Sequence, residues 1–422
     1  MLFLVFLLLE IASLYFYMAS SPIGFLCFVA NILIVLHSKE TLYYKTLSLL
    51  IAALPFSFIG IAGIEMLHVF SWYNLFLIIF LFISRKYCSL SSGATISIFI
   101  VFFCLLIATL WSEDTVKSWV EISQIMVMLY PTALLFSSSS RVPLSQAQVE
   151  KLLTLYAFVA LCTSVGMIIQ YYFYFFRGTE IGLFNFSGGG RVSCYALFRG
   201  ASILPIYMGS GLMVFFIKFL DRKSIYYLLA MIIIFVAMIL NTSRTGVFAL
   251  FAVVGYVIFT RLKGHFSIST IIIALLAVYI GTMGLDYLMT SRSNLDSFTE
   301  ANGREETIWN GIDIWLNSPR NFFFGEGFTG GMWDGITKTH NFVIQTLAQN
   351  GVIVASIIFC MLGQFLLSVK RKKYKYVSWF ILIAGMLVTD FYANAFTSLV
   401  FILVSIYDDQ VFTEEEPINK IL

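Results

Sequence analysis

The chain has 422 residues, of which 59% are hydrophobic and only 12% are charged, and its net charge is +3. Soluble proteins carry about 25% charged residues. The composition therefore excludes an ordinary soluble protein and predicts a polytopic integral membrane protein.

Apolar runs recur along the whole chain. A transmembrane helix needs about 20 mainly apolar residues, and candidate segments lie at 1–19, 21–37, 46–66, 69–84, 94–111, 119–137, 152–176, 200–219, 225–241, 245–261, 268–288, 342–369, 377–393 and 395–407. The predicted fold is all-α, a single membrane domain over residues 1–422 with about 12–14 transmembrane helices. The first span has no basic segment and no small-residue cleavage site, which favours a retained helix over a signal peptide.

Basic residues predict the orientation, because short cytoplasmic loops are enriched in Lys and Arg. If Arg85 and Lys86 are cytoplasmic, alternation puts both termini in the cytoplasm. The same side then holds Arg141, Lys151, Lys218, Arg222, Lys223, Arg261, Lys263 and the run Lys370-Arg371-Lys372-Lys373. Most of the six cysteines lie in or beside apolar runs, so neither a disulfide framework nor a metal cluster is predicted.

Two outer segments stand out by their length, a shorter loop at 177–199 and a large loop at 290–340. In the large loop, Asn302 is a suitable cap for a short helix with Arg304 in its first turn, and Ser318-Pro319 ends that helix. The glycines of Gly325-Glu326-Gly327 permit a tight turn.

The segment after this loop is too long for one straight span. Residues 340–370 would form a helix of about 46 Å, against a hydrocarbon core of about 30 Å. Asn350-Gly351 is the predicted kink. Asn341, Gln345 and Gln349 share one helix face, which predicts an amphipathic piece at the outer surface before the kink.

Arginine dominates the basic residues predicted to lie outside, which are Arg177, Arg191, Arg199, Arg244, Arg292, Arg304 and Arg320 with few lysines. A guanidinium group binds phosphate oxygens in a bidentate way and stays ionised when partly buried. The bias predicts a partly enclosed diphosphate site. The alternative is binding to lipid headgroups or to outer acids. Arg244 fits that alternative poorly, because it lies in a short turn between two apolar helices.

His340 is the candidate general base of this outer side. It opens a helix, where the dipole favours the neutral imidazole that a base requires. A purely structural hydrogen bond is the alternative reading. Trp309 lies in the same loop and could stack on a sugar ring.

The order of these motifs resembles the bacterial O-antigen polymerase and O-antigen ligase superfamily. The matching residues cover about a third of the chain and are Thr242-Ser243-Arg244-Thr245-Gly246, Gly303-Arg304 with Trp309, Ser318-Pro319, Gly325-Glu326-Gly327, and His340-Asn341 with Gly351. Ligases often have a second histidine two residues before the His-Asn pair, and this chain has Lys338 there, which favours a polymerase. The ligase stays an alternative, and a lipid-linked oligosaccharide flippase is an alternative of another class.

The resemblance implies a transferase of the bacterial inner membrane that uses a polyprenyl-diphosphate-linked donor at the periplasmic face, with no cofactor and no metal. It implies catalytic roles for His340, Arg304 and Arg244. Substrate binding would fall to Arg191, Arg199, Arg177, Asn341 and Trp309. The expected partners are an undecaprenyl-diphosphate-linked oligosaccharide, the lipid bilayer and a chain-length regulator protein, and no nucleic acid.

Overall fold

The structure of the chain is a computed structural model. It describes residues 2–61, 71–87, 89–111, 143–187, 191–198, 202–241, 244–262, 304–327, 339, 341–369, 372–388 and 394–407, with isolated residues between 115 and 133 and at 279. For Arg191, Arg244 and Arg304 it describes the backbone and not the side chain.

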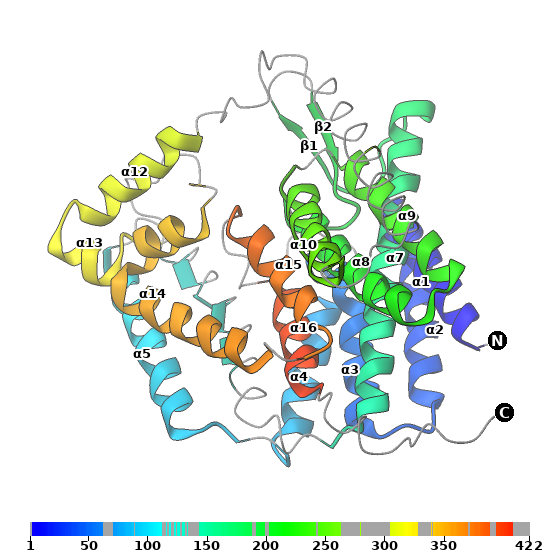
Figure 1. The fold of residues 1–422 in the computed structure, drawn as a ribbon, viewed down its shortest axis with the longest axis horizontal. Coiled ribbons are helices and arrows are strands. Elements are labelled where there is room, and N and C mark those ends of the chain that lie inside the picture. The colour runs from blue at the N-terminus through cyan, green and yellow to red at the C-terminus, as the bar shows by residue number, and fades with distance from the viewer. Residues whose placement is uncertain are drawn as a thin grey trace.

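The N-terminal part of the chain forms a series of apolar helices, blue to cyan in Figure 1: α1 (Leu2–Met18), α2 (Ile23–His37), α3 (Leu42–Ala53), the 3-10 turn η1 (Leu54–Phe56), α4 (Trp72–Ser84), α5 (Ser92–Ala108) and the 3-10 turn η3 (Thr109–Trp111). Thr41, Ser71 and Ser91 each accept a hydrogen bond from the backbone N–H three residues on. Such caps satisfy donors that lack an intrahelical partner. Polar residues just before the apolar runs thus mark where these helices begin.

The rest of the chain contains the longest helices and one small sheet: α7 (Gln146–Arg177), β1 (Phe184–Ser187), β2 (Arg191–Cys194), α8 (Ile203–Arg222), α9 (Ile225–Leu240), α10 (Arg244–Leu262), α12 (Arg304–Leu316), α13 (Pro319–Phe324), α14 (Phe342–Val369), α15 (Lys375–Gly385) and α16 (Ala395–Ile406). The strands pair antiparallel, with Phe184 opposite Cys194 and Ser187 opposite Arg191. Helix α7 begins with a capping box formed by Ser145 and Gln148.

The all-α prediction is confirmed, with the β1–β2 hairpin in the 177–199 loop as an addition. Among the described helices, α7, α8 and α14 are long and apolar enough to cross a membrane, and the others are shorter apolar helices. The predicted spans at 225–241 and 342–369 coincide with α9 and α14. Those at 119–137 and 268–288 lie wholly or partly outside the described residues.

Two predicted boundaries are wrong. The span expected at 46–66 begins earlier, at Leu42, and its α-helix ends at Ala53 because Pro55 lies in the tighter turn that follows. The span expected at 377–393 ends as a helix at Gly385. By contrast, the predicted kink in α14 is confirmed, since Gly351 has φ 69° and ψ 174° inside the helix.

The core lies where α7, α8, α9 and α15 meet. Tyr156 and Tyr207 are fully buried there with their rings edge to face. Small residues allow the helices to approach closely: a Cβ atom at Gly211 of α8 would lie 2.5 Å from the Cβ atom of Ala160 of α7, and one at Gly209 would lie 2.3 Å from the ring of Phe380 in α15. Close packing through small residues is typical of helices in membranes.

Apolar side chains also cover much of the periphery. Phe82 of α4, Phe99 of α5 and Tyr226 of α9 are 68%, 69% and 78% exposed. Exposed rings on several helices suit a lipid environment better than water.

The helices run back and forth, so the loops gather at two ends of the bundle. One end, called here the basic end, is crossed by three ion pairs: Lys151–Glu40 (3.4 Å), Lys218–Glu150 (2.8 Å) and Lys373–Asp221 (2.7 Å). These residues belong to the helix ends and loops that the sequence assigns to the cytoplasm. Both ends of the described chain, at Leu2 and Tyr407, also lie here, because Leu2 lines a cavity with Lys39 and the ring of Tyr407 contacts Tyr374 beside Lys373.

The opposite end, called here the hairpin end, carries the β1–β2 hairpin at the top of Figure 1. Backbone hydrogen bonds join the hairpin loop to α1, with Gly182 N donating to Met18 O at 2.8 Å. The region of α13 also lies at this end, since a Cβ atom on Gly327 would lie 3.2 Å from the carbonyl oxygen of Ala108 at the end of α5. The described parts of the segments predicted to lie outside are therefore on the opposite end from the basic loops.

Candidate functional site

The hairpin loop is held by one buried amide. Gln170 of α7 is fully buried, and its Nε2 donates to the carbonyl oxygens of Ile181 (2.8 Å) and Leu183 (2.9 Å). Its Oε1 accepts a hydrogen bond from Ala196 N at 2.7 Å. The amide therefore binds both arms of the loop, entering and leaving the hairpin, and fixes the direction in which β2 and Arg191 approach the helices.

A second buried amide joins two of the predicted arginine segments. Asn241, the residue that ends α9, is fully buried, and its Nδ2 donates to Cys194 O at 2.7 Å. Cys194 ends the strand that Arg191 begins, and Asn241 precedes the turn that leads to Arg244. The shorter outer loop and the Arg244 turn, about 50 residues apart in sequence, are thus adjacent at the hairpin end.

The first turn of α10 is also packed tightly. Thr245 is buried, and a Cβ atom on Gly246 would lie 2.7 Å from the Cβ atom of Pro205 in the first turn of α8. No larger side chain than hydrogen fits at Gly246 without moving one helix. The start of α10, where the backbone of Arg244 lies, is therefore packed closely against α8.

The thiol of Cys194 is not a candidate nucleophile. It is fully buried, and burial raises the pKa of the Cys194 thiol to about 12. The reactive form of cysteine is the thiolate, which is scarce at neutral pH when the pKa is so high. Among the described residues, no group of three or more His, Cys, Asp or Glu side chains is placed to hold a metal ion.

The second predicted segment is the helix that begins at Arg304. A Cβ atom on Gly311 of α12 would lie 2.6 Å from the Cγ2 atom of Thr339 and 2.8 Å from the Cγ2 atom of Ile344. Arg304 precedes Gly311 by about two turns and shares its face of the helix. Trp309 points the other way and is 58% exposed, which leaves its ring accessible to a ligand.

The glycine pair of the large loop meets the kink of α14. A Cβ atom on Gly325 would lie 2.2 Å from Gln349 O, and one on Gly351 would lie 2.3 Å from Phe323 O. The backbones of α13 and α14 are in direct contact here. Glu326 N donates to Ala348 O at 2.8 Å, and Gly327 N donates to Gln349 O at 3.0 Å. The kink frees these two carbonyl groups of α14, and the turn after α13 binds them.

A polar network secures the same turn from the side of α13. Glu326 is 7% exposed, and its Oε2 accepts hydrogen bonds from Arg320 (2.9 Å) and from the Nδ2 of Asn321 (2.5 Å). Asn321 Nδ2 also donates to Ile314 O in α12, and Ser318 caps α13 through Asn321 N. Sequence reasoning placed Arg320 only among the outer arginines, whereas the structure gives it a carboxylate partner.

The polar face of α14 before the kink points into the protein. Gln345 is fully buried and its Oε1 accepts hydrogen bonds from Thr339 N and Thr339 Oγ1, both at 3.0 Å. Gln349 is also buried. The amphipathic pattern is therefore present, and the amide of Gln345 binds Thr339 at the end of the large loop.

Of the remaining predicted site residues, the structure describes two and leaves two outside the described residues. Arg177 is the exposed last residue of α7. Asn341 caps α14, with its Oδ1 accepting from Val343 N (3.0 Å) and Ile344 N (3.2 Å). His340 and Arg199 lie outside the described residues.

Two groups of predicted residues result. One is the hairpin group, with the backbones of Arg191 and Arg244. The other is the α12–α14 group, with the backbone of Arg304, Trp309 and Asn341. Figure 1 shows the hairpin and α12 apart from one another, so the described residues form two separate groups.

A scan of the chain against protein-family models gives no match, and a search of characterised proteins gives none either. The resemblance to the O-antigen polymerase and ligase superfamily therefore depends on the motif residues of this chain alone.

Proposed function

We propose that this chain is a polysaccharide polymerase of the bacterial inner membrane. It transfers a growing glycan from undecaprenyl diphosphate to a sugar hydroxyl of another undecaprenyl-diphosphate-linked repeat unit. The hairpin end faces the periplasm, where the transfer takes place, and the basic end with both termini faces the cytoplasm. The alternative ligase would transfer the glycan to a different acceptor, lipid A-core. The alternative flippase would move the lipid-linked oligosaccharide across the membrane without glycosyl transfer.

One observation carries the proposal: the described motif residues between Arg304 and Gly351 meet in one packing unit, while the Arg244 motif lies in the separate hairpin group. Gly325 and Gly351 lie in backbone contact, and Ser318 caps the helix that leads to that contact. Gly311, two turns after Arg304, packs on Thr339 beside His340. These contacts support the proposal because they bring the described motif residues of the large loop to the start of α14.

The chemistry follows from the residue types. The bond between the anomeric carbon of the growing glycan and the diphosphate oxygen breaks, and the acceptor hydroxyl oxygen forms the new bond to that carbon. Undecaprenyl diphosphate leaves, and arginines stabilise the charge that develops on it. Arg304 and Arg244 have this role, with Arg191, Arg199 and Arg177 holding the diphosphate. His340 accepts or positions the hydroxyl proton.

The test is polymerisation of purified lipid-linked repeat unit by the purified full chain. We expect Arg304→Ala and His340→Ala to lower the rate by about 10²-fold or more, the usual effect of removing one electrostatic or acid–base group. Arg85→Ala is the matched control, because Arg85 is exposed after α4 at the basic end. Full activity in both site variants would refute the proposed site.

A deletion strain separates the polymerase from its alternatives. Loss of a polymerase leaves lipid A-core capped with a single repeat, whereas loss of a ligase leaves bare core. A flippase would lose carrier translocation in the Arg304→Ala variant, and a polymerase would keep it. An unchanged polysaccharide ladder would contradict both the polymerase and the ligase.

A further inference from the structure

A cavity of about 840 Å³ opens at the basic end of the bundle, far from the proposed transfer site. It lies between the start of α1, the end of α2, the start of α7 and the end of α8. Its volume falls within the range of about 300–1,000 Å³ typical of small-molecule sites. We call it the basic pocket, because four cationic side chains and one carboxylate line it: Lys39, Lys151, Lys218, Arg222 and Glu150.

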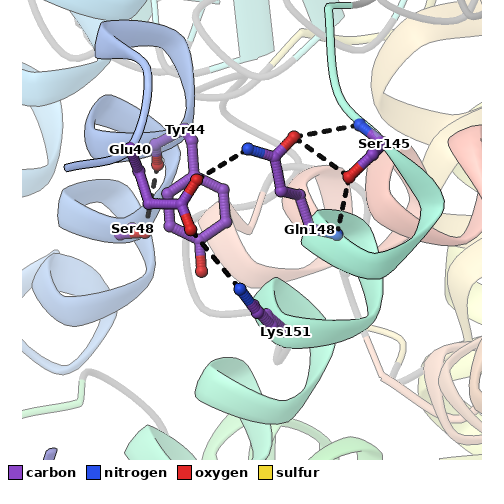
Figure 2. A network of polar contacts seen from close by, with 6 residues as sticks. All are labelled: Glu40, Tyr44, Ser48, Ser145, Gln148 and Lys151. Carbon is purple, nitrogen blue, oxygen red and sulfur yellow. Dashed lines mark hydrogen bonds and ion pairs between the residues drawn. The ribbon is translucent and has the colours of Figure 1, made fainter. Parts of the chain in front are cut away.

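Two of these cations are already neutralised by the protein. Lys218 is only 4% exposed, and its Nζ lies 2.8 Å from Glu150. Lys151 lies 3.4 Å from Glu40, whose other oxygen accepts a hydrogen bond from Gln148 at 2.7 Å. Figure 2 shows this arrangement, with Gln148 and Lys151 of α7 reaching the same carboxylate.

The other two cationic side chains can still pair with an anionic ligand. Lys39 and Arg222 are exposed, and neither forms an ion pair in the part of the chain that the structure describes. Arg222 follows Lys218 by four residues and lies on the same face of α8. The Lys218–Glu150 ion pair therefore lies beside a guanidinium group that forms no ion pair among the described residues.

An apolar groove continues from the basic pocket. A second cavity of about 670 Å³ runs between α1 and α2, lined by Leu2, Val5, Leu33, Ile34, Leu36 and His37. Leu2, Ile34 and His37 also line the basic pocket, so the two cavities adjoin. Leu33 is 61% exposed and Leu2 is 56% exposed, which opens the groove to the surroundings of the bundle.

We propose that the basic pocket and its groove bind an anionic phospholipid of the surrounding bilayer. The phosphate lies between Lys39 and Arg222, and an acyl chain lies along Leu2, Val5 and Leu33. A soluble anion would use the cations and leave the groove empty. A zwitterionic lipid would carry its own cation into a pocket that already has two uncompensated ones. The proposal depends on the chain lying in a membrane and is independent of glycosyl transfer.

The experiment is native mass spectrometry of the full chain released from detergent with increasing phosphatidylglycerol or phosphatidylcholine. We expect tighter binding of phosphatidylglycerol, because each basic residue near an anionic headgroup contributes about 1 kcal/mol, or roughly fivefold in affinity. Lys39→Gln and Arg222→Gln should each remove about fivefold, and Arg222→Lys should restore most of the loss. Arg85→Gln is the matched control, because Arg85 is an exposed arginine after α4 that does not line the pocket.

Three outcomes would overturn the proposal. One is equal affinity for the two lipids in the wild type. Another is an unchanged phosphatidylglycerol preference in the Lys39→Gln/Arg222→Gln double variant, with its fold checked by size exclusion. The third is competition by glycerol 3-phosphate at the concentration of the lipid, which would mean that the pocket binds the anion without the acyl chain.

Discussion

Replacement of Gly351 by alanine tests whether the kink in α14 holds the large loop in place. The conformation of Gly351, φ 69° and ψ 174°, belongs to a region that is essentially restricted to glycine, and a side chain there costs about 1–3 kcal/mol. The new Cβ atom would also lie 2.3 Å from Phe323 O, so α13 must move. That movement breaks the hydrogen bonds from Glu326 N and Gly327 N, at about 0.5–1.5 kcal/mol each.

The expected cost of Gly351→Ala is the sum of these effects, about 2–6 kcal/mol. Hydrogen exchange of the amides of Glu326 and Gly327 reports it directly, and 2 kcal/mol corresponds to an acceleration of about 30-fold. Gly363→Ala in the same helix is the control. A Cβ atom there meets nothing within 4 Å, so alanine should be neutral or slightly stabilising. Equal exchange in the two variants would refute the role of the kink.

Three further predictions concern single carboxylates. Glu326→Ala should loosen α13 by about 1.5–3 kcal/mol, because Asn321 loses a charged acceptor, measured as faster proteolysis within 319–327. Glu10→Gln should keep the thermal stability in detergent, whereas Glu10→Ala should cost about 1–3 kcal/mol, because Asn31 loses its acceptor. Hydrogen bonds from Gln148 and then Lys151 lower the pKa of Glu40 below its ordinary 4.5. The stabilisation by ionised Glu40 is therefore present above pH 4.5 and is lost as the pH falls through the lowered pKa. The thermal stabilities of the wild type and Glu40→Gln, measured in detergent, should become equal in acid.

The sequence predicts the helices well, because membrane helices are specified by local apolar length. The limits of α9 and α14 follow from their apolar runs, and the kink follows from Asn350-Gly351 together with the excess length. The sequence also contains a pattern that is typical of the hairpin. Phe184 and Phe186 alternate with polar residues before a glycine run, and Val192 and Cys194 do so after it, which is the pattern of two strands around a turn.

Tertiary contacts between distant loops were not predictable from the sequence. Nothing local distinguishes Gln170, which fixes both arms of the hairpin loop, from any other polar residue in an apolar helix. The same applies to Asn241, whose partner Cys194 lies in a different loop. The resemblance predicted that Asn341 binds the substrate, and the structure shows that its Oδ1 caps α14.

The basic end and the β1–β2 hairpin are held by different polar groups, and this difference bears on where an anion can bind. At the basic end, carboxylates from Glu40, Glu150 and Asp221 pair with lysines and join helices to one another. At the hairpin end, the contacts described between the hairpin and the helices use backbone groups and the amides of Gln170 and Asn241. Neutral amides hold a loop without consuming or adding charge. For the diphosphate site proposed above, the contacts that hold the hairpin therefore add no carboxylate to repel the ligand or compete for its arginines. The carboxylate of Glu326, which does lie at this end, belongs to the α13 turn and is already paired with Arg320.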